Sequence, residues 1–244
     1  MKLSKKLKRR IKQRMYASIA CLTTILILYT SLNFNNVSVT LDKVFGKNEA
    51  LTTSTRLPNT STITYIYNTS DLIAFRNDVN SGENYSGRTV YLMSDIDMSS
   101  ICSSSVGSWV PIGVGVNGGF AGTFDGNYHT ISNLYINKSD CIDLGFFSIL
   151  TGVVRNLKFD NVYIENTNNA NINTQTGTIS GSNHGTILNC GVNSGTLKAT
   201  KTSINYNKNY PGPNLGGITA ANTTGIVKNC YNRATIINKR SKCK

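Results

Sequence analysis

Two short segments of nearly the same sequence constrain the fold of this chain more than any other feature. Residues 185–190 read GTILNC, and residues 225–230 read GIVKNC. Two earlier segments share their pattern of an apolar or Thr-Ile step, a variable residue, Asn, and then Leu or Cys. The four segments are HTISNLYIN (129–137), GVVRNLKFDNVYI (152–164), GTILNCGVNSGTL (185–197) and GIVKNCYNRATII (225–237). Such repetition predicts a repeat architecture, because each unit must pack against its neighbours to bury an apolar face.

The repeated asparagines set the expected period. They are Asn133, Asn156, Asn189 and Asn229, which lie 23, 33 and 40 residues apart. A core coil of about 20–25 residues reproduces these intervals if polar loops are inserted at 166–175 and 198–214. Short β-branched runs separated by Gly and Asn follow as far as residue 238, which favours a β-solenoid over a β-sandwich. Stacked coils would place the asparagines in one hydrogen-bonded column at a turn.

The segment before the repeats predicts a short helix in an otherwise all-β fold. TITYIY (62–67) alternates as a strand does, and GRTVYLMSDIDM (87–98) predicts a second strand. Between them, TSDLIAFRNDVN (69–80) places apolar residues at helical spacing, and Thr69 or Ser70 can cap the helix. We therefore expect one domain over residues 62–238, beginning with an amphipathic capping helix.

The N-terminus predicts export. Eight basic residues lie within residues 1–14. Residues 15–34 form an apolar run without a charge, long enough to span a bilayer. This pattern is typical of a secretory signal peptide or of a membrane-spanning anchor whose basic flank stays in the cytoplasm. No clear cleavage site follows, so both alternatives stay open. We interpret residues 35–61 as a polar linker and residues 239–244 as a basic tail.

The formal net charge of +13 lies mostly at the two ends of the chain. Nine basic residues and no acidic residue follow Glu165, whereas the middle of the chain is mildly acidic. Nucleic-acid-binding proteins instead carry a basic stripe interleaved with stacking aromatic residues. We therefore expect no nucleic-acid partner.

The cysteines are widely spaced and lack the C-x-x-C pairs that would favour zinc. In the repeat alignment, Cys190 and Cys230 stand where Leu134 and Leu157 stand in earlier units. A position shared by Leu and Cys is typical of a core, so we expect buried free thiols there. A disulfide stays open as an alternative, because immediately neighbouring coils would bring the two Cα atoms to about 5 Å.

Several phrases together resemble the GLUG-motif repeats. They are WVPIG (109–113), FAGTFDGNYHTISNLYI (120–136), LGFFSIL (144–150) and the G-x-I/V-x-N-C/L phrases above. Residues 71–99 are similar to the segment that usually precedes such repeats. GLUG repeats occur in exported bacterial surface proteins and upstream of immunoglobulin A1-specific zinc metallopeptidase domains. The resemblance covers residues 62–238 and implies a right-handed parallel β-helix on a bacterial cell surface, without implying an activity.

Acidic residues and histidines supply the candidates for catalysis or metal binding. Asp95, Asp97 and Asp125 could serve a polysaccharide hydrolase or lyase, but we interpret them as residues that end strands or form turns. Calcium held by Asp95 and Asp97 stays an alternative. The two histidines, His129 and His184, lie outside any H-E-x-x-H motif, and no G-x-S-x-G motif is visible. We therefore predict no catalytic residue, metal or cofactor.

The polar insertion at 198–214 is the expected contact surface, because binding residues on repeat scaffolds tend to lie on such loops. Its candidate residues are Lys201, Tyr206, Lys208 and Tyr210. Trp109 could also stack on a sugar, although packing within the fold is the simpler interpretation. These residues predict binding to a host or cell-wall glycan, or to an anionic wall polymer.

The sequence hypothesis is a non-enzymatic, exported module at the cell surface, used for adhesion, for glycan or wall-polymer binding, or as a spacer. Two alternatives stay open. One is the N-terminal part of a larger surface metallopeptidase, and the other is a polysaccharide-active β-helix enzyme.

Overall fold

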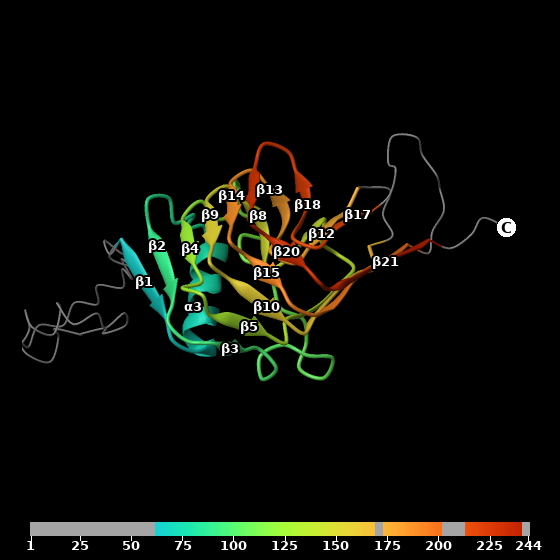
Figure 1. Ribbon diagram of the computed structural model, residues 1–244, viewed down its shortest axis with the longest axis horizontal. Coiled ribbons are helices and arrows are strands. Elements are labelled where there is room, and N and C mark those ends of the chain that lie inside the picture. The colour runs from blue at the N-terminus through green and yellow to red at the C-terminus, as the bar shows by residue number, and fades with distance from the viewer. Residues whose placement is uncertain (1–61, 169–172, 202–212, 241–244) are drawn as a thin grey trace, which may run out of the picture. The chain divides into compact units, whose positions relative to one another are not determined.

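The computed structural model describes residues 62–168, 173–201 and 213–240. All of them belong to one compact unit, Pro58–Lys244. This part of the chain is mostly β-structure with one helix, as Figure 1 shows. The expected signal or anchor segment and the linker after it lie outside the described residues. Within the described ranges, no helix is long and apolar enough to cross a membrane.

The strands follow one another in a regular order. The first elements are β1 (Ile63–Ile66), α3 (Thr69–Asn80), β2 (Thr89–Leu92) and β3 (Ile96–Asp97). Five strands follow, β4 (Thr123–Asp125), β5 (Thr130–Ser132), β6 (Tyr135–Lys138), β7 (Asp143–Leu144) and β8 (Phe147–Leu150). The next five are β9 (Val153–Arg155), β10 (Lys158–Asp160), β11 (Val162–Asn166), β12 (Gln175–Gly177) and β13 (Ser180–Asn183). Then come β14 (Thr186–Leu188), β15 (Gly191–Val192), β16 (Gly195–Lys201), β17 (Asn214–Gly216) and β18 (Thr219–Asn222). The last strands are β19 (Ile226–Lys228), β20 (Tyr231–Asn232) and β21 (Thr235–Arg240).

Each group of five strands is one pass of the chain through five sheets. The sheet orders are β1-β2-β4-β9-β14-β19, β3-β5-β10-β15-β20, β6-β11-β16-β21, β7-β12-β17 and β8-β13-β18. Every ladder between these strands is parallel, so a strand pairs with its counterparts in the passes before and after it. Figure 1 shows this arrangement, with β2, β4, β9 and β14 side by side.

The interior of the stack is filled by apolar side chains that occupy equivalent register positions in successive passes. In the first sheet, Phe124, Val154 and Ile187 are register neighbours and are all fully buried. A single pass could not bury these side chains, so its neighbours supply the rest of the core. The row ends at Val227 of β19, which is 38% exposed because β19 is the last described strand of its sheet.

The predicted helix is confirmed, with the bounds expected from the sequence, Thr69–Asn80. Asn68, rather than Thr69 or Ser70, caps its N-terminus, because the Asn68 side chain accepts hydrogen bonds from two backbone N–H groups of the first turn. Its buried residues are Leu72, Phe75 and Val79. The Phe75 ring meets the Phe120 ring edge-on at 5.5 Å. Helix α3 therefore covers the core beside the first pass, which consists of β4 to β8.

The pairing register corrects the predicted period. Ser132 of β5 pairs with Asp160 of β10, which places Asn133 opposite Asn161 rather than Asn156. The first residues of β4, β9, β14 and β19 lie 30, 33 and 40 residues apart, so a core coil of about 20–25 residues is too short. The alignment failed because Asn also adopts a positive φ after a short strand at a second corner, as Asn133 does after β5 and Asn161 does after β10.

The predicted insertions lie at one corner of the stack. Four residues separate β6 from β7, eight separate β11 from β12, and twelve separate β16 from β17. Strand β16 continues to Lys201, so the later insertion begins at residue 202 rather than at residue 198. The passes therefore differ in length mainly because this one connection grows.

Candidate functional site

Three of the four predicted asparagines form a column at one corner. Asn156, Asn189 and Asn229 each have a φ of 54°. Asn229 Nδ2 donates to Asn189 Oδ1 at 3.2 Å, and Asn189 Nδ2 donates to Asn156 Oδ1 at 3.3 Å. Asn tolerates this left-handed conformation better than most residues. The column therefore combines a turn with hydrogen bonds between passes, which is a structural role.

Asn133 belongs to a second column, which corrects the prediction of a single one. Asn133 Nδ2 donates to Asp97 Oδ1 at 2.7 Å, and Asn133 Oδ1 accepts from Asn161 Nδ2 at 2.6 Å. Asp97 also accepts from the backbone N–H of Ser99 at 2.9 Å. The hydrogen bond from Asn133, and then those from Ser99, lower the pKa of Asp97. Asp97 therefore stabilises a turn, in line with the interpretation from sequence.

Asp95 also accepts structural hydrogen bonds. Its Oδ1 accepts from the backbone N–H of Thr130 at 2.8 Å and lies 3.1 Å from Nδ1 of His129. The Thr130 hydrogen bond is the main cause that lowers the pKa of Asp95. Within the described part of the chain, no three His, Cys, Asp or Glu side chains are grouped to hold a metal. The calcium alternative therefore gains no support from this region.

Asp125 lies at the head of the first asparagine column. It accepts from Nε of Arg155 at 2.8 Å, from Nδ2 of Asn156 at 3.0 Å and from the backbone of Asn127 at 2.9 Å. Burial alone would raise the pKa of this carboxyl, but the three hydrogen bonds together hold its pKa below the ordinary value. The acid of a glycosidase needs a raised pKa. Asp125 therefore fits the turn interpretation rather than a proton donor.

One carboxyl that the sequence did not single out has a raised pKa. Partial burial raises the pKa of Asp143, and Ser182 Oγ donates to Asp143 Oδ1 at 2.5 Å. Nδ1 of His184 lies 3.4 Å from Oγ1 of Thr224. Ser182 thus donates its proton to a carboxylate rather than to an imidazole, which is not how a serine nucleophile is activated.

Trp109 is corrected from a candidate sugar-binding residue to a core residue. Its side chain is 1% exposed, and its ring stacks on the Phe146 ring at 5.7 Å with 5° between the planes. Trp109 Nε1 donates to the backbone oxygen of Phe146 at 3.3 Å, and the Arg76 guanidinium lies 4.6 Å from the Trp109 ring centroid. Phe146 and Arg76 therefore take the contacts that a sugar would need.

The other predicted ligand-binding residues are not tested. Lys201 ends β16, while Tyr206, Lys208 and Tyr210 lie outside the described residues. Their contact role stays a prediction.

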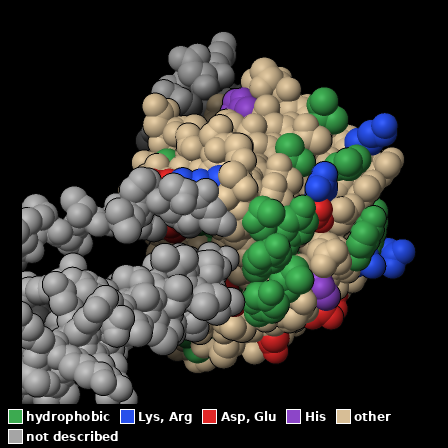
Figure 2. Space-filling view, turned by 90° about the vertical axis from the view of Figure 1, so that its left-hand side faces the viewer, with side chains coloured by type: hydrophobic (Ala, Val, Ile, Leu, Met, Phe, Trp, Pro, Cys, Tyr) green, Lys and Arg blue, Asp and Glu red, His purple; other side chains and the backbone are tan. Residues whose placement is uncertain are grey.

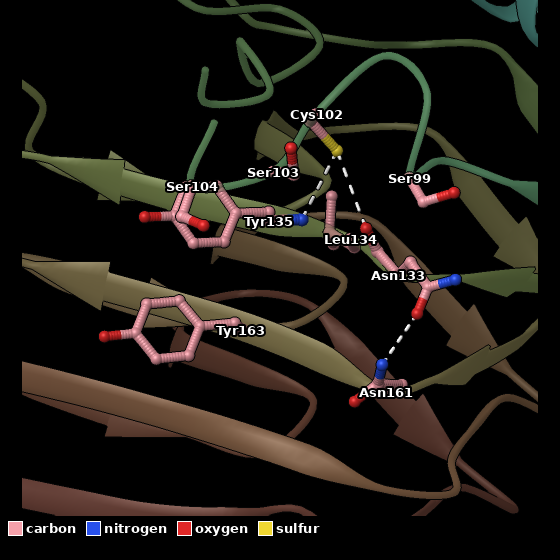
Figure 3. A pocket seen from close by; sticks show the side chains of 9 residues that line it. All are labelled: Ser99, Cys102, Ser103, Ser104, Asn133, Leu134, Tyr135, Asn161 and Tyr163. Atoms are coloured by element: carbon pink, nitrogen blue, oxygen red, sulfur yellow. Dashed lines mark hydrogen bonds between the residues drawn. The ribbon is translucent and has the colours of Figure 1, made fainter. Parts of the chain in front are cut away.

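The described residues contain a pocket of about 270 Å³ beside β6 and β11. Figure 3 shows the residues that line it, which are Ser99, Cys102, Ser103, Ser104, Asn133, Leu134, Tyr135, Asn161 and Tyr163. Hydroxyl, amide and aromatic groups predominate, and no Lys, Arg, Asp or Glu side chain is among them. The pocket is therefore neutral, with several hydrogen-bonding groups around an aromatic wall.

Two stacked tyrosines form the aromatic wall. Tyr135 of β6 and Tyr163 of β11 are register partners, and their rings lie 5.3 Å apart with 11° between the planes. The Tyr163 hydroxyl donates to Glu165 Oε2 at 2.5 Å, and Glu165 Oε1 accepts from Lys198 Nζ at 2.6 Å. The hydrogen bond to Glu165 raises the pKa of Tyr163 to about 12. The phenol therefore stays protonated, and its ring is fixed in orientation.

The loop after β3 forms the opposite wall. Cys102 Sγ accepts from the backbone N–H of Tyr135 at 3.4 Å and lies 3.6 Å from the backbone oxygen of Asn133. Burial raises the pKa of the Cys102 thiol, so the thiol stays neutral. Sequence reasoning missed this pocket because residues 99–104, 133–135 and 161–163 meet only through the register, which the alignment had wrong.

The cysteine prediction is confirmed for Cys190 and holds in part for Cys230. Both are free thiols. Cys190 is 1% exposed and takes the position of Leu157 one pass later, whereas Cys230 is only half-buried. Leu134 takes the position of Val162 instead, so its expected equivalence to the cysteines was wrong.

A second group of tyrosines consists of Tyr65 on β1, Tyr67 just after β1, and Tyr91 on β2. The Tyr65 and Tyr91 rings stack at 6.1 Å, and the Tyr67 ring lies 6.3 Å from that of Tyr65. Tyr65 is 43% exposed and Tyr67 is 58% exposed. Figure 2 shows hydrophobic side chains gathered on the face of the molecule where β1 lies. Tyr65 and Tyr67 are therefore exposed tyrosines that do not line the pocket.

No protein-family model matches the chain. A segment of 133 residues, 51% of the chain, is 31% identical to halomucin of Haloquadratum walsbyi. A segment of 116 residues, 46% of the chain, is 32% identical to a protein of Evansella cellulosilytica whose name describes a Gly-rich membrane protein. The matches span 1% and 13% of the lengths of these relatives. Both names indicate surface or membrane-associated proteins.

One solved structure is similar over 71% of this chain and 67% of its own, with 17% sequence identity and a TM-score of 0.38. It is the crystal structure of a putative immunoglobulin A1 protease from Bacteroides ovatus.

Proposed function

We propose that residues 62–238 form a GLUG-type, right-handed parallel β-helix module that is exported to the cell surface and binds neutral glycans without catalysis. The stacked parallel passes and the helix beside the first pass support the fold. The basic and apolar N-terminal segment and the names of the two sequence relatives support the location.

The stacked pair of Tyr135 and Tyr163 beside the neutral pocket is the observation that carries the glycan proposal. A sugar ring presents C–H groups on its faces, which pack well against an aromatic ring, and hydroxyl groups at its edge. Serine hydroxyls and asparagine amides can donate and accept hydrogen bonds with those hydroxyls. The absence of charged side chains among the pocket-lining residues favours a neutral glycan over the anionic wall polymer considered from sequence.

The non-enzymatic part of the proposal is supported by the acidic residues. Asp95, Asp97 and Asp125 have lowered pKa values and accept hydrogen bonds that stabilise turns. A polysaccharide hydrolase would instead need a pair of carboxyls at a defined separation, one with a raised pKa. Asp143 does have a raised pKa, but the side chain that contacts it is the Ser182 hydroxyl rather than a second carboxyl.

A glycan array probed with the full chain tests the proposal. We expect retention on neutral glycans, little retention on sulfated or uronic-acid glycans, and reduced retention for Ser104→Ala, whose exposed hydroxyl lines the pocket. Ser139→Ala, which removes the hydroxyl of an exposed serine outside the pocket lining, is the matched control. Retention of no neutral glycan, or equal retention by Ser104→Ala and the wild-type chain, would overturn the proposal.

The location is tested separately by adding protease to intact cells that express the chain. We expect cleavage of residues 62–238 without cell lysis, because the basic N-terminal flank should stay in the cytoplasm. Cleavage only after lysis would contradict export.

A further inference from the structure

Cys190 and Cys230 face each other on neighbouring passes. Leu188 pairs with Lys228 just before them, and Gly191 pairs with Tyr231 just after them. The two cysteines therefore hold the same position in adjacent parallel segments, which lie about 4.8 Å apart. Disulfide-bonded cysteines have Cα atoms about 4.4–6.8 Å apart. The register thus places the pair within disulfide range.

The thiols also shift each other's pKa and differ in their exposure. Contact with Cys230, together with burial, raises the pKa of Cys190, and contact with Cys190 lowers the pKa of Cys230. Cys190 is 1% exposed, whereas Cys230 is half-buried. Cys230 is therefore the sulfur that an oxidant in solution can reach, and Cys190 is placed to resolve the product.

We propose that Cys190 and Cys230 are a redox-convertible pair, and that oxidation cross-links the last described pass to the pass before it. The oxidant is a low-molecular-weight disulfide, for which glutathione disulfide is the probe. The Cys230 thiolate attacks one sulfur of the oxidant, which forms a mixed disulfide and releases one glutathione thiolate. Cys190 gives its proton to solvent and attacks Cys230 Sγ, which forms the Cys190–Cys230 bond and releases the second thiolate. The two protein thiols lose two electrons and two protons, and the oxidant becomes two thiols.

The place of the pair gives the cross-link an effect on stability. β19, β20 and β21 are each the last described strand of their sheet. Val227 and Ile236 of this pass are 38% and 45% exposed, although their counterparts Ile187 and Leu197 are fully buried. Among the described residues this pass has a neighbouring pass on one side only, and such a pass is the first to separate from a stack. A disulfide would hold this pass in place.

The other described cysteines serve as controls. Cys102 contacts backbone groups of Asn133 and Tyr135, and Cys141 contacts Asp140. The inference does not depend on glycan binding, because the pair lies on neither wall of the pocket.

The test incubates the full chain with glutathione disulfide, blocks the remaining thiols and digests the product with trypsin. Cys190 lies in the tryptic segment 159–198 and Cys230 in the segment 229–233. We expect these two segments to be linked by a disulfide. We also expect the oxidised chain to unfold about 5–10 °C above the reduced chain.

The variants Cys190→Ala and Cys230→Ala should each lose the linked segments and the temperature shift, while Cys141→Ala should keep both. A wild-type chain without the linked segments, or with equal unfolding temperatures in both redox states, would overturn the proposal even if a variant failed to fold. Equal pairing of Cys230 with other cysteines would overturn it as well.

Discussion

The side-chain nitrogen of Asn189 donates to the side-chain oxygen of Asn156 across 3.3 Å, from one pass of the chain to the pass before it. Both residues have a φ of 54°, so the same side chain that makes the turn also ties the passes together. This contact repeats between Asn229 and Asn189 at 3.2 Å. The repeated sequence segment around these asparagines therefore corresponds to the same corner in successive passes.

Comparing Asn189→Ala with Asn189→Gly should separate the two roles of Asn189, which are its positive φ and its side-chain hydrogen bonds. Alanine loses the amide and also resists the left-handed conformation, so we expect a loss of about 2–3 kcal/mol in the free energy of unfolding. Glycine accepts the conformation and loses only the amide, with an expected cost of about 1 kcal/mol. Urea unfolding measures both. Equal costs would show that the positive φ is not a source of strain.

Asp125→Asn should destabilise the chain at neutral pH by about 1–2 kcal/mol, because three donors would face a neutral amide. The pKa of Asp125 is lowered in the folded chain despite its burial. Its stabilisation is therefore present above its unfolded pKa, about 3.9, and is lost as the pH falls through the folded pKa. The difference between wild type and variant in urea unfolding should shrink below about pH 4. A difference that grows toward acid would contradict this assignment.

Glu165→Gln should bring the titration of Tyr163 down from its raised pKa of about 12 toward the ordinary value of 10.0. The carboxylate accepts the phenol proton at 2.5 Å and so disfavours its loss, whereas an amide would not carry the charge. Tyrosinate absorbance during alkaline titration measures the shift, and Tyr163→Phe identifies which step belongs to this residue. An unchanged titration curve in Glu165→Gln would show that the contact does not control the phenol.

Phe75→Ala should cost about 3–5 kcal/mol of unfolding free energy, because it leaves a cavity between α3 and the first pass. Phe75 is 2% exposed and contacts the rings of Phe120 and Phe124. Ile73→Ala on the same helix removes a partly buried side chain and should cost clearly less. Similar costs for the two variants would show that the helix is not seated on the core through Phe75.

Much of the fold was readable from local patterns. The helix at 69–80 was predicted with its bounds, because its apolar spacing is a local signal, but its capping residue is Asn68 rather than Thr69 or Ser70. The corner formed by Asn156, Asn189 and Asn229 was also predicted, since each follows a short β-branched strand. These features depend on neighbouring residues in the chain, which is the information that a single sequence carries best.

The pairing register of β5 with β10 could not be predicted from the sequence, and the pocket was therefore not predicted either. Asn133 and Asn156 both follow a three-residue strand and both adopt a positive φ. The local sequences around them are therefore alike, although the two residues lie at different corners of the fold. Only the pairing of β5 with β10 separates the two. The stacking of Tyr135 on Tyr163 follows from the same register and therefore could not be inferred.

The affinity of the full chain for a neutral glycan retained on the array, measured by titration calorimetry, tests the central claim most directly. The variant pair Tyr135→Ala/Tyr163→Ala is compared with Tyr65→Ala/Tyr67→Ala, which removes two exposed tyrosines outside the pocket. Loss of both pocket rings should weaken binding at least about tenfold, which corresponds to about 1.4 kcal/mol, while the control pair binds as the wild-type chain does. Equal affinities for the pocket pair and the wild-type chain would contradict the account.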